Sequence, residues 1–307
     1  MRIALTGASG FIGAAIARRL KADGHLVHGM VRETSRRDHV DDLLDRVVVG
    51  LQEQEDAQAQ LLADADALVH NSVDWEVLKN ESIDRHIEVN LTPSLKLFQA
   101  AADASIPVVF LSSVAVHHHM RDRWSGNVDE DHPSRPGSLY GALKSSLESH
   151  LWALHTMKSL SFTSLRPAAV YGIDPRTTRS IGYPIIRAIA EDGAYERSGG
   201  GKFVHVDDVA ACTAAALERP HPSAGVYHLA DCYARWGDWA SITADLLGVQ
   251  AQINLESPTA ARNTFVKSAV QDDLGVAMDR GHDGIRTHLG ELIDVMRTQG
   301  ELSPAAS

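Results

Sequence analysis

The chain of 307 residues has few cysteines, no surplus of basic residues and no long apolar run. Its two cysteines, Cys212 and Cys232, form no CxxC pair, which argues against a disulfide framework and against a zinc site. We therefore expect two plain core thiols and no bound metal. No apolar stretch approaches the roughly 18 residues that cross a bilayer, so we expect no membrane partner.

Acidic side chains outnumber basic ones along the whole chain. Lys and Arg together number 29 and Asp and Glu 40, which gives a formal net charge of −11. Such a field repels nucleic acid backbones, so nucleic acid is not an expected partner. The first residues lack the charged leader and apolar stretch of a secretory signal, which predicts a cytoplasmic setting.

The first half of the chain alternates short β-branched runs with amphipathic stretches, the pattern of a parallel sheet flanked by helices. The predicted strands are Arg2–Thr6, Leu26–Val31, Arg46–Val49, Ala67–His70, Val108–Leu111 and Phe162–Leu165. The predicted helices between them are Phe11–Ala22, Asp56–Ala63, Ile83–Ala102 and Leu139–Met157. This order predicts an α/β fold with a doubly wound parallel sheet of the Rossmann type.

Beyond Pro167 the pattern loosens, and glycine, proline and arginine cluster. We therefore predict a dinucleotide-binding domain over residues 1–171 and a smaller, mostly helical, C-terminal substrate-binding lobe over residues 172–307. Within the lobe, residues 203–229 are expected to return to the main sheet.

A glycine-rich loop connects the first predicted strand to the first predicted helix. Gly7 allows the tight turn, Gly10 lets the backbone approach a pyrophosphate, and Gly13 lets the helix pack on the sheet. The N–H groups at the helix N-terminus then face the phosphates. The predicted dinucleotide contacts from this loop are Gly7, Ser9, Gly10, Phe11, Ile12 and Gly13.

The end of the second strand bears on which nicotinamide cofactor is bound. An NAD site places an acidic residue there to bond the ribose 2′-hydroxyl. Arg32 stands near that position, with Arg36 and Arg37 behind it, and guanidinium groups suit a phosphate dianion. NADP is therefore the favoured cofactor. In the alternative, these arginines are solvated and Glu33 bonds the ribose of NAD.

Tyr140 and Lys144 are four residues apart, so a predicted helix presents the phenol and the ammonium on one face. A free tyrosine has a pKa of about 10, and a nearby cation is needed to make it an acid or base near neutrality. Lys144 is expected to supply that cation together with an oxidised nicotinamide. Ser113 follows a predicted strand at the carboxyl edge, where doubly wound sheets bind ligands, and there it can hydrogen-bond a substrate oxygen.

These motifs in order give the chain a resemblance to the extended short-chain dehydrogenases/reductases, also called the NAD-dependent epimerase/dehydratase family. The resemblance covers roughly residues 1–235, through TGASGFIG, IEVNLTPSLKLFQAA, FLSSVAV, YGALK, SLRPAAVYG and FVHVDDVA. It implies that Ser113 is the substrate hydroxyl, Tyr140 the general acid/base, and Lys144 both the tuner of Tyr140 and a ligand of the nicotinamide ribose. It also implies a homodimer.

The same resemblance assigns further cofactor contacts. Pro167 and Val170 are expected to line the nicotinamide. Asn71, Ser72 and Asn90 are expected to approach the ribose and phosphates.

The chain departs from the family pattern at places that bear on the substrate. The serine strand leads into His117-His118-His119, for which a pocket role and a solvated loop are both open. The family arginine that holds a sugar-nucleotide diphosphate is absent before Phe203, where Lys202 is the nearby cation. The third strand ends without the usual Asp, at Gln52. These departures weaken the case for a nucleotide-sugar substrate more than the case for cofactor binding.

Three functions follow from these residues. The first is an NAD(P)-dependent oxidoreductase that transfers hydride between the nicotinamide and a carbonyl or alcohol carbon of a small organic substrate. The second is an epimerase or dehydratase that returns the hydride internally. The third is an NADP-sensing binding module, which the retention of Ser113, Tyr140 and Lys144 disfavours.

Overall fold

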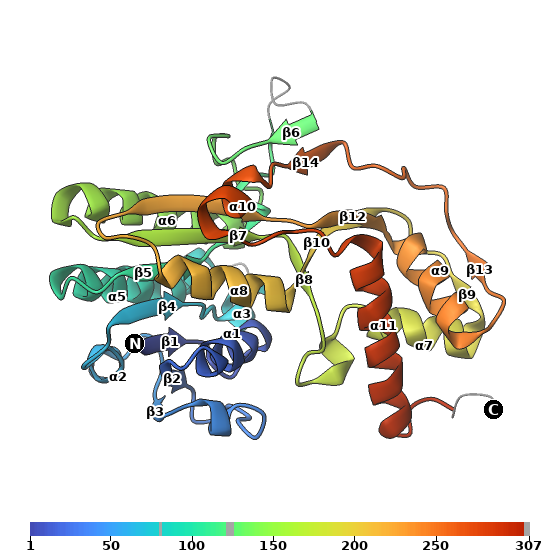
Figure 1. The fold of residues 1–307 in the computed structure, drawn as a ribbon, viewed down its shortest axis with the longest axis horizontal. Coiled ribbons are helices and arrows are strands. Elements are labelled where there is room, and N and C mark those ends of the chain that lie inside the picture. Colours follow the sequence, from blue (N-terminus) through green and yellow to red (C-terminus); the bar gives the residue numbers. More distant parts are fainter. Residues whose placement is uncertain (80–81, 121–125, 304–307) are drawn as a thin grey trace.

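In the computed structural model, which describes residues 1–79, 82–120 and 126–303, seven parallel strands form one sheet in the order β11-β7-β5-β4-β1-β2-β3 (Figure 1). Their bounds are β1 Arg2–Thr6, β2 Leu26–Val31, β3 Arg46–Val49, β4 Ala67–His70, β5 Val108–Leu111, β7 Phe162–Pro167 and β11 Ala224–Leu229. The strand order reverses between β1 and β4, which is where doubly wound sheets bind ligands. The predicted α/β fold is confirmed.

Helices cover both faces of the sheet. On one face α1 packs against α8, and α10 packs on α8 and β11; on the other face α5 packs against α6. Their bounds are α1 Phe11–Ala22, α2 Glu55–Leu62, α5 Thr92–Asp103, α6 Leu139–Lys158, α8 Val206–Leu217 and α10 Ser268–Leu274. The strands are apolar on both sides because each side is covered.

The predicted continuous helix over Ile83–Ala102 is wrong in one respect. A short helix, α4 (Ile83–His86), passes into a π-helical turn over Ile87–Leu91 before α5 begins. Pro93 has no N–H to donate to the carbonyl of Val89, and the Gln52 side chain donates to that carbonyl instead. The interruption follows from that missing donor.

The C-terminal lobe has its own apolar core, in which α7, α9 and α11 surround Tyr171, Phe203 and Trp239. Its helices are α7 Tyr183–Asp192, α9 Trp236–Leu247 and α11 Gly281–Thr298. Its strands are β8 Ala169–Tyr171, β10 Gly200–His205 and β12 Cys232–Arg235, which form one sheet, and β9 Ala194–Tyr195 and β13 Gln252–Ile253, which form another. The lobe is thus helical around small sheets that the sequence patterns did not reveal.

The stretch 203–229 divides between the two parts of the molecule. β11 pairs with β7 and adds the seventh strand to the main sheet, and α8 covers a face of that sheet. Residues 203–205 instead end β10 in the small sheet of the lobe. The chain therefore crosses from lobe to sheet within this stretch.

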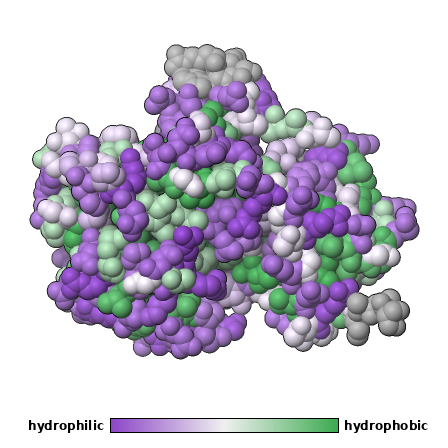
Figure 2. All heavy atoms as spheres, viewed as in Figure 1, coloured by the Kyte–Doolittle hydropathy of each residue, from purple (hydrophilic) through white to green (hydrophobic). Residues whose placement is uncertain are grey.

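Two further short segments lie near the site. Helix α3 spans Trp75–Lys79, and strand β6 (Gly126–Val128) pairs with β14 (Asn263–Phe265) beside the ends of β5 and β7. Cys212 and Cys232 are both free. In the described residues no helix is long and apolar enough to span a membrane. Figure 2 shows a face on which hydrophobic residues form small groups among hydrophilic ones.

Candidate active site

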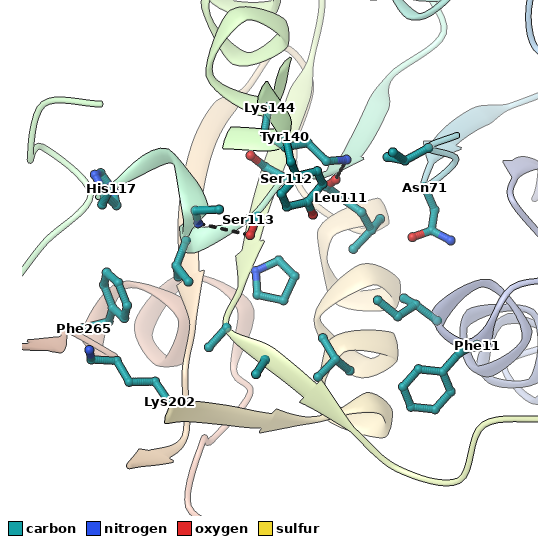
Figure 3. A pocket seen from close by; sticks show the side chains of 18 of the residues that line it. Phe11, Asn71, Leu111, Ser112, Ser113, His117, Tyr140, Lys144, Lys202 and Phe265 are labelled. Atoms are coloured by element: carbon teal, nitrogen blue, oxygen red, sulfur yellow. Dashed lines mark hydrogen bonds between the residues drawn. The ribbon is translucent and has the colours of Figure 1, made fainter. Parts of the chain in front are cut away.

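A cavity of about 610 Å³ lies at the carboxyl ends of the sheet strands and extends toward the lobe (Figure 3). Its walls come from the start of α1, the ends of β4, β5 and β7, the first turns of α6, and strands β8, β10 and β14. Among the predicted site residues, those lining it are Phe11, Ile12, Asn71, Ser113, Tyr140, Lys144, Pro167 and Val170. The sequence motifs are thus brought together at one place.

The glycine loop packs tightly against the start of α1 and the loop after β4. Gly7 has φ +68°, and a Cβ there would lie 3.2 Å from the Asn71 amide nitrogen. A Cβ on Gly13 would lie only 2.1 Å from the Gly7 carbonyl oxygen, so glycine is required for the helix to pack this closely. Gly10 is the residue immediately before α1, and no side chain of the described residues caps the first turn of this helix. The N–H groups of that first turn therefore lack a side-chain acceptor, as a pyrophosphate site requires.

Tyr140 and Lys144 lie one turn apart on α6, whose start is fixed by Ser138 accepting a hydrogen bond from the Gly141 N–H at 3.1 Å. Lys144 Nζ donates to the Leu111 carbonyl at 2.5 Å and lies 5.7 Å from the centre of the Tyr140 ring. Ser113 accepts from the Ala115 N–H at 3.1 Å, and its hydroxyl is close enough to Tyr140 to lower the pKa of the phenol. Serine, phenol and ammonium therefore share one wall of the cavity (Figure 3).

Burial dominates the titration of this wall. It lowers the pKa of Lys144 to about 7, with only a small opposing effect from Glu148. Burial raises the pKa of Tyr140, and the nearby Ser113 hydroxyl opposes that rise only in part. Lys144 is not among the groups that shift this pKa in the structure, and the joint effect expected of Lys144 and an oxidised nicotinamide stays a prediction. The amine is directed at the Leu111 carbonyl and is desolvated, so near neutrality it carries only part of its charge.

Sequence reasoning missed Trp75. Its ring lies 4.6 Å from the Tyr140 ring, centre to centre, and it lines the cavity from the start of α3. The indole covers the phenol and contributes to the burial that raises the Tyr140 pKa. The signal available was a large aromatic residue just beyond the carboxyl end of a central strand.

Ser72 and Asn90 are among the predicted cofactor residues that do not line the cavity. Ser72 donates to the Gln52 side chain at 2.6 Å. Asn90 is 1% exposed, and its amide accepts from the Asp74 N–H at 2.7 Å and donates to the Asp74 carbonyl at 3.2 Å. These bonds tie the loop after β4 to the π-helical turn. Both residues thus bond to neighbouring protein groups, and their predicted contact with the cofactor stays a prediction.

The remaining loop residues and Arg32 sit beside the crevice. The carbonyl of Ser9 accepts a hydrogen bond from His39 at 3.1 Å, which fixes the loop against the segment after β2. Arg32 follows β2 with a side chain that is 60% exposed, 3.8 Å from Asp74. Its guanidinium is therefore solvated and available to a ligand on this edge.

The other end of the cavity is built by residues far apart in sequence, namely His117, Met120, Lys202 and Phe265. His117 is buried, whereas His118 and His119 are exposed, so the open question about this triplet resolves into one cavity residue and two surface residues. The centre of the Phe265 ring lies 6.2 Å from the centre of the His117 ring and 5.4 Å from the Lys202 ammonium. None of these contacts follows from a local motif.

A buried polar cluster supports His117 from behind. Its Nε2 lies 3.0 Å from Nε2 of His228 and 3.0 Å from the Arg166 guanidinium. Arg166 also pairs with Glu148 at 2.7 Å. Burial, and then the charge of Arg166, lowers the pKa of His117 to about 4, so this imidazole is neutral at physiological pH. Across residues 1–79, 82–120 and 126–303, no group of three His, Cys, Asp or Glu side chains is arranged to hold a metal.

The glycine loop and the Ser-Tyr-Lys wall agree with what comparison by sequence finds. The model of the NAD dependent epimerase/dehydratase family matches residues 3–230. The chain belongs to this family. The resemblance predicted from the sequence is thereby confirmed.

Individual relatives of this epimerase/dehydratase family member are distant. The polyketide synthase-nonribosomal peptide synthetase hybrid himA of Aspergillus japonicus is 28% identical over 258 residues, which are 73% of this chain and 6% of himA. The 3-diazoavenalumate denitrifying reductase of a Streptomyces species is 27% identical over 303 residues, or 94% of this chain and 95% of that protein. The first of these relatives is thus far longer than this chain, and the second has its length.

Among solved structures, MoeE5 in complex with UDP-glucuronic acid and NAD matches this family member with a TM-score of 0.79 at 22% identity. The match covers 96% of this chain and 99% of that one. At this identity the likeness establishes the shared fold, lobe included.

Proposed function

We propose that the protein is an NADP-dependent oxidoreductase that transfers hydride between the nicotinamide and a carbonyl or alcohol carbon of a small organic substrate. The observation that carries this proposal is the meeting of Ser113, Tyr140 and Lys144 on one wall of a cavity that begins at the glycine loop. Residues 1–171 are proposed to bind the dinucleotide, and residues 172–307 to supply most of the substrate side.

The residues of the crevice fit a dinucleotide. Glycine at positions 7 and 13 lets the loop and α1 pack closely, a Cβ on Gly10 would meet only the Gly7 carbonyl oxygen among the described residues, and the first turn of α1 has no side-chain cap. Pro167 and Val170 would lie along the nicotinamide, and Asn71 along its ribose and phosphates. When bound, the nicotinamide supplies or accepts the hydride and, when oxidised, adds a positive charge to the site.

In the reductive direction Ser113 donates a hydrogen bond to the substrate oxygen, and Tyr140 gives its phenolic proton to that oxygen. Lys144 holds the cofactor ribose and, once protonated, favours the phenolate that is left. A buried amine with a pKa near 7 can take up and release a proton at little cost near neutrality. It is therefore suited to pass a proton toward Tyr140.

Two observations favour a net reductase over an enzyme that returns the hydride internally. The relative of matching length is a reductase by name. The position before Lys202 is Gly201, so the arginine expected of a diphosphate site is missing. Stoichiometric loss of NADPH absorbance during turnover supports the reductase, and product without that loss supports the epimerase or dehydratase.

The NADP preference rests on Arg32, which is solvated at the end of β2. NAD remains the alternative, with Glu33 as the ribose ligand. A homodimer stays a prediction of the family resemblance. Consistent with it, Trp152 and Met157 on α6 are 46% and 76% exposed. The cytoplasmic setting likewise stays a prediction.

The test of the proposed function is Tyr140→Phe. Loss of the phenolic proton should lower kcat by about 100-fold or more, while the NADPH dissociation constant stays within about threefold. Tyr195→Phe, in the lobe strand β9, is the matched control and should keep full activity. An equal loss of turnover and NADPH affinity in Tyr140→Phe would show that the tyrosine is only structural.

A further inference from the structure

The substrate end of the cavity contains an ammonium without a countercharge. Lys202 projects from β10, is half-buried, and forms no ion pair with any carboxylate of the described residues. Its ammonium lies over the face of the Phe265 ring, 5.4 Å from the ring centre. Burial lowers its pKa, and no carboxylate opposes that effect. A desolvated cation of this kind is stabilised by an anion that a ligand brings.

The ammonium lies away from the reacting groups. In Figure 3, Lys202 and Phe265 occupy the side of the cavity opposite Tyr140, with Ser113 between the two sides. Beside His117, much of the lining at this end is apolar. Val114, Met120, Ala168 and Phe265 belong to one apolar cluster and line the cavity together with Ala169. A substrate that spans this distance therefore has an apolar body between a reacting carbonyl and an anionic end.

The number of cationic side chains in the cavity limits how much negative charge the anionic end of the substrate can carry. Lys144 and Lys202 are the two cationic side chains on the cavity wall as described, and Lys144 is directed at the Leu111 carbonyl beside Tyr140. One ammonium suits a single carboxylate. A diphosphate is typically held by several donors, with arginine forks prominent among them.

We propose that Lys202 binds a carboxylate of the substrate, so that the enzyme acts on apolar carbonyl acids or the corresponding hydroxy acids. The proposal rests on the proposed function, since Tyr140 marks where the carbonyl reacts. Lys202 is then the residue that selects the substrate class. Phe265 holds the ammonium at the end of the apolar wall.

The test compares probes that share a reacting aldehyde and differ in charge: 4-formylbenzoate, 4-formylcinnamate and the methyl ester of each. Reduction moves a hydride from NADPH to the aldehyde carbon and a proton to its oxygen, leaving an alcohol and NADP⁺. For the better acid, wild-type kcat/KM should exceed that of its ester by about 10-fold or more. In Lys202→Met this acid-to-ester ratio should fall to about one, mainly through KM, and in Lys202→Arg it should persist.

Lys96→Met removes an exposed lysine that pairs with Glu55 and serves as the matched charge control. It should retain the wild-type ratio. Equal rates for acid and ester in the wild type, or a ratio that survives in Lys202→Met, overturn the proposal. So does a clear preference for 4-formylphenyl phosphate over both acids, because the site would then select a phosphate.

A binding measurement distinguishes a failure of this proposal from a failure of the proposed function. Titration calorimetry of cinnamate into the NADP⁺-loaded protein needs no turnover, and Lys202→Met should weaken binding by about 10-fold or more while NADP⁺ affinity is kept. If no aldehyde is reduced but this loss appears, the proposed reductase activity fails and the carboxylate site stands. If aldehydes are reduced and cinnamate binds both proteins equally, the carboxylate site fails alone.

Discussion

The two ends of the cavity are built in different ways. The cofactor end is made of backbone: a glycine loop, a helix N-terminus and the ends of adjacent parallel strands. The substrate end is made of side chains such as His117, Lys202 and Phe265, which come from three distant parts of the chain. The geometry of the cofactor end depends on a few glycines in a short segment, whereas the geometry of the substrate end depends on how the lobe packs. The first end therefore suits one cofactor class, and the second can change its ligand by single substitutions.

The largest expected effect comes from disturbing the close backbone contact between the glycine loop and α1 at the cofactor end of the cavity. In Gly13→Ala the new Cβ would meet the Gly7 carbonyl oxygen at 2.1 Å, so α1 must move away from the loop. We expect NADPH affinity to fall by about 100-fold or more, with a lower Tm, because overpacking of a tight contact costs about 1–3 kcal/mol or more. Calorimetry and thermal unfolding measure the two effects.

Gly290→Ala is the matched control, since a Cβ there has no neighbour within 4 Å and the residue lies within α11. Alanine should stabilise this helix by roughly 0.5–1 kcal/mol and leave cofactor binding intact. NADPH affinity in Gly13→Ala within threefold of wild type would show that the close packing at this end is dispensable.

The next effect concerns Lys144, where the two ends meet. Its pKa is about 7 in the folded protein and about 10.4 in an unfolded chain. Between these values the unfolded chain binds more protons, so the free energy of unfolding rises with pH, and below pH 7 the full penalty of the buried charge applies. Lys144→Met should therefore stabilise the cofactor-free protein at pH 6–7, by on the order of 2 kcal/mol.

That gain should shrink as the pH rises above 7 and vanish only above about 10.4, where the wild-type amine is neutral in both states. Denaturant unfolding of both proteins at intervals from pH 6 to 10 measures it. Lys96→Met should show no such trend, because the Lys96 side chain is 56% exposed. A difference between Lys144→Met and wild type that is constant with pH would mean that Lys144 is not held as a desolvated amine.

The smallest expected effect concerns Arg32, at the outer edge of the cofactor end of the cavity. Arg32→Glu should raise the KM for NADPH by about 10- to 100-fold and change that for NADH much less, since a charge-assisted bond to the 2′-phosphate is lost. Steady-state kinetics with both cofactors measures the ratio. If the wild type prefers NADH and Glu33→Gln weakens that preference, the alternative cofactor is the correct one.

Local patterns predicted most of the sheet. The bounds of five predicted strands, β1 to β5, and of α1 agree with the structure, because alternation, period and the glycine loop are encoded in neighbouring residues. The interruption at Ile87–Leu91 was not predicted: Pro93 gave a local signal, but the Val89 carbonyl is satisfied by Gln52 from another element. Strand β8 was missed because it has only three residues, and β10 because it begins in a glycine cluster; the two pair across more than 30 positions of the chain.

The site divides in the same way. The spacing of Tyr140 and Lys144 placed both on one helix face, and the glycines placed the dinucleotide crevice. The protonation of that pair was decided by burial, to which the Trp75 ring contributes, and Trp75 is not near the pair in sequence. Ser72 and Asn90 bond to Gln52 and Asp74 and do not line the cavity, and their contact with a cofactor stays a prediction.

By itself the sequence determined the sheet, the glycine loop and the residues of one cavity wall, because each arises from residues within a few turns or one strand of one another. Only the tertiary structure decided how strongly that wall is desolvated and which side chains meet at the far end of the cavity. Desolvation and charge pairing depend on every element packed around a group. No local pattern contains that information.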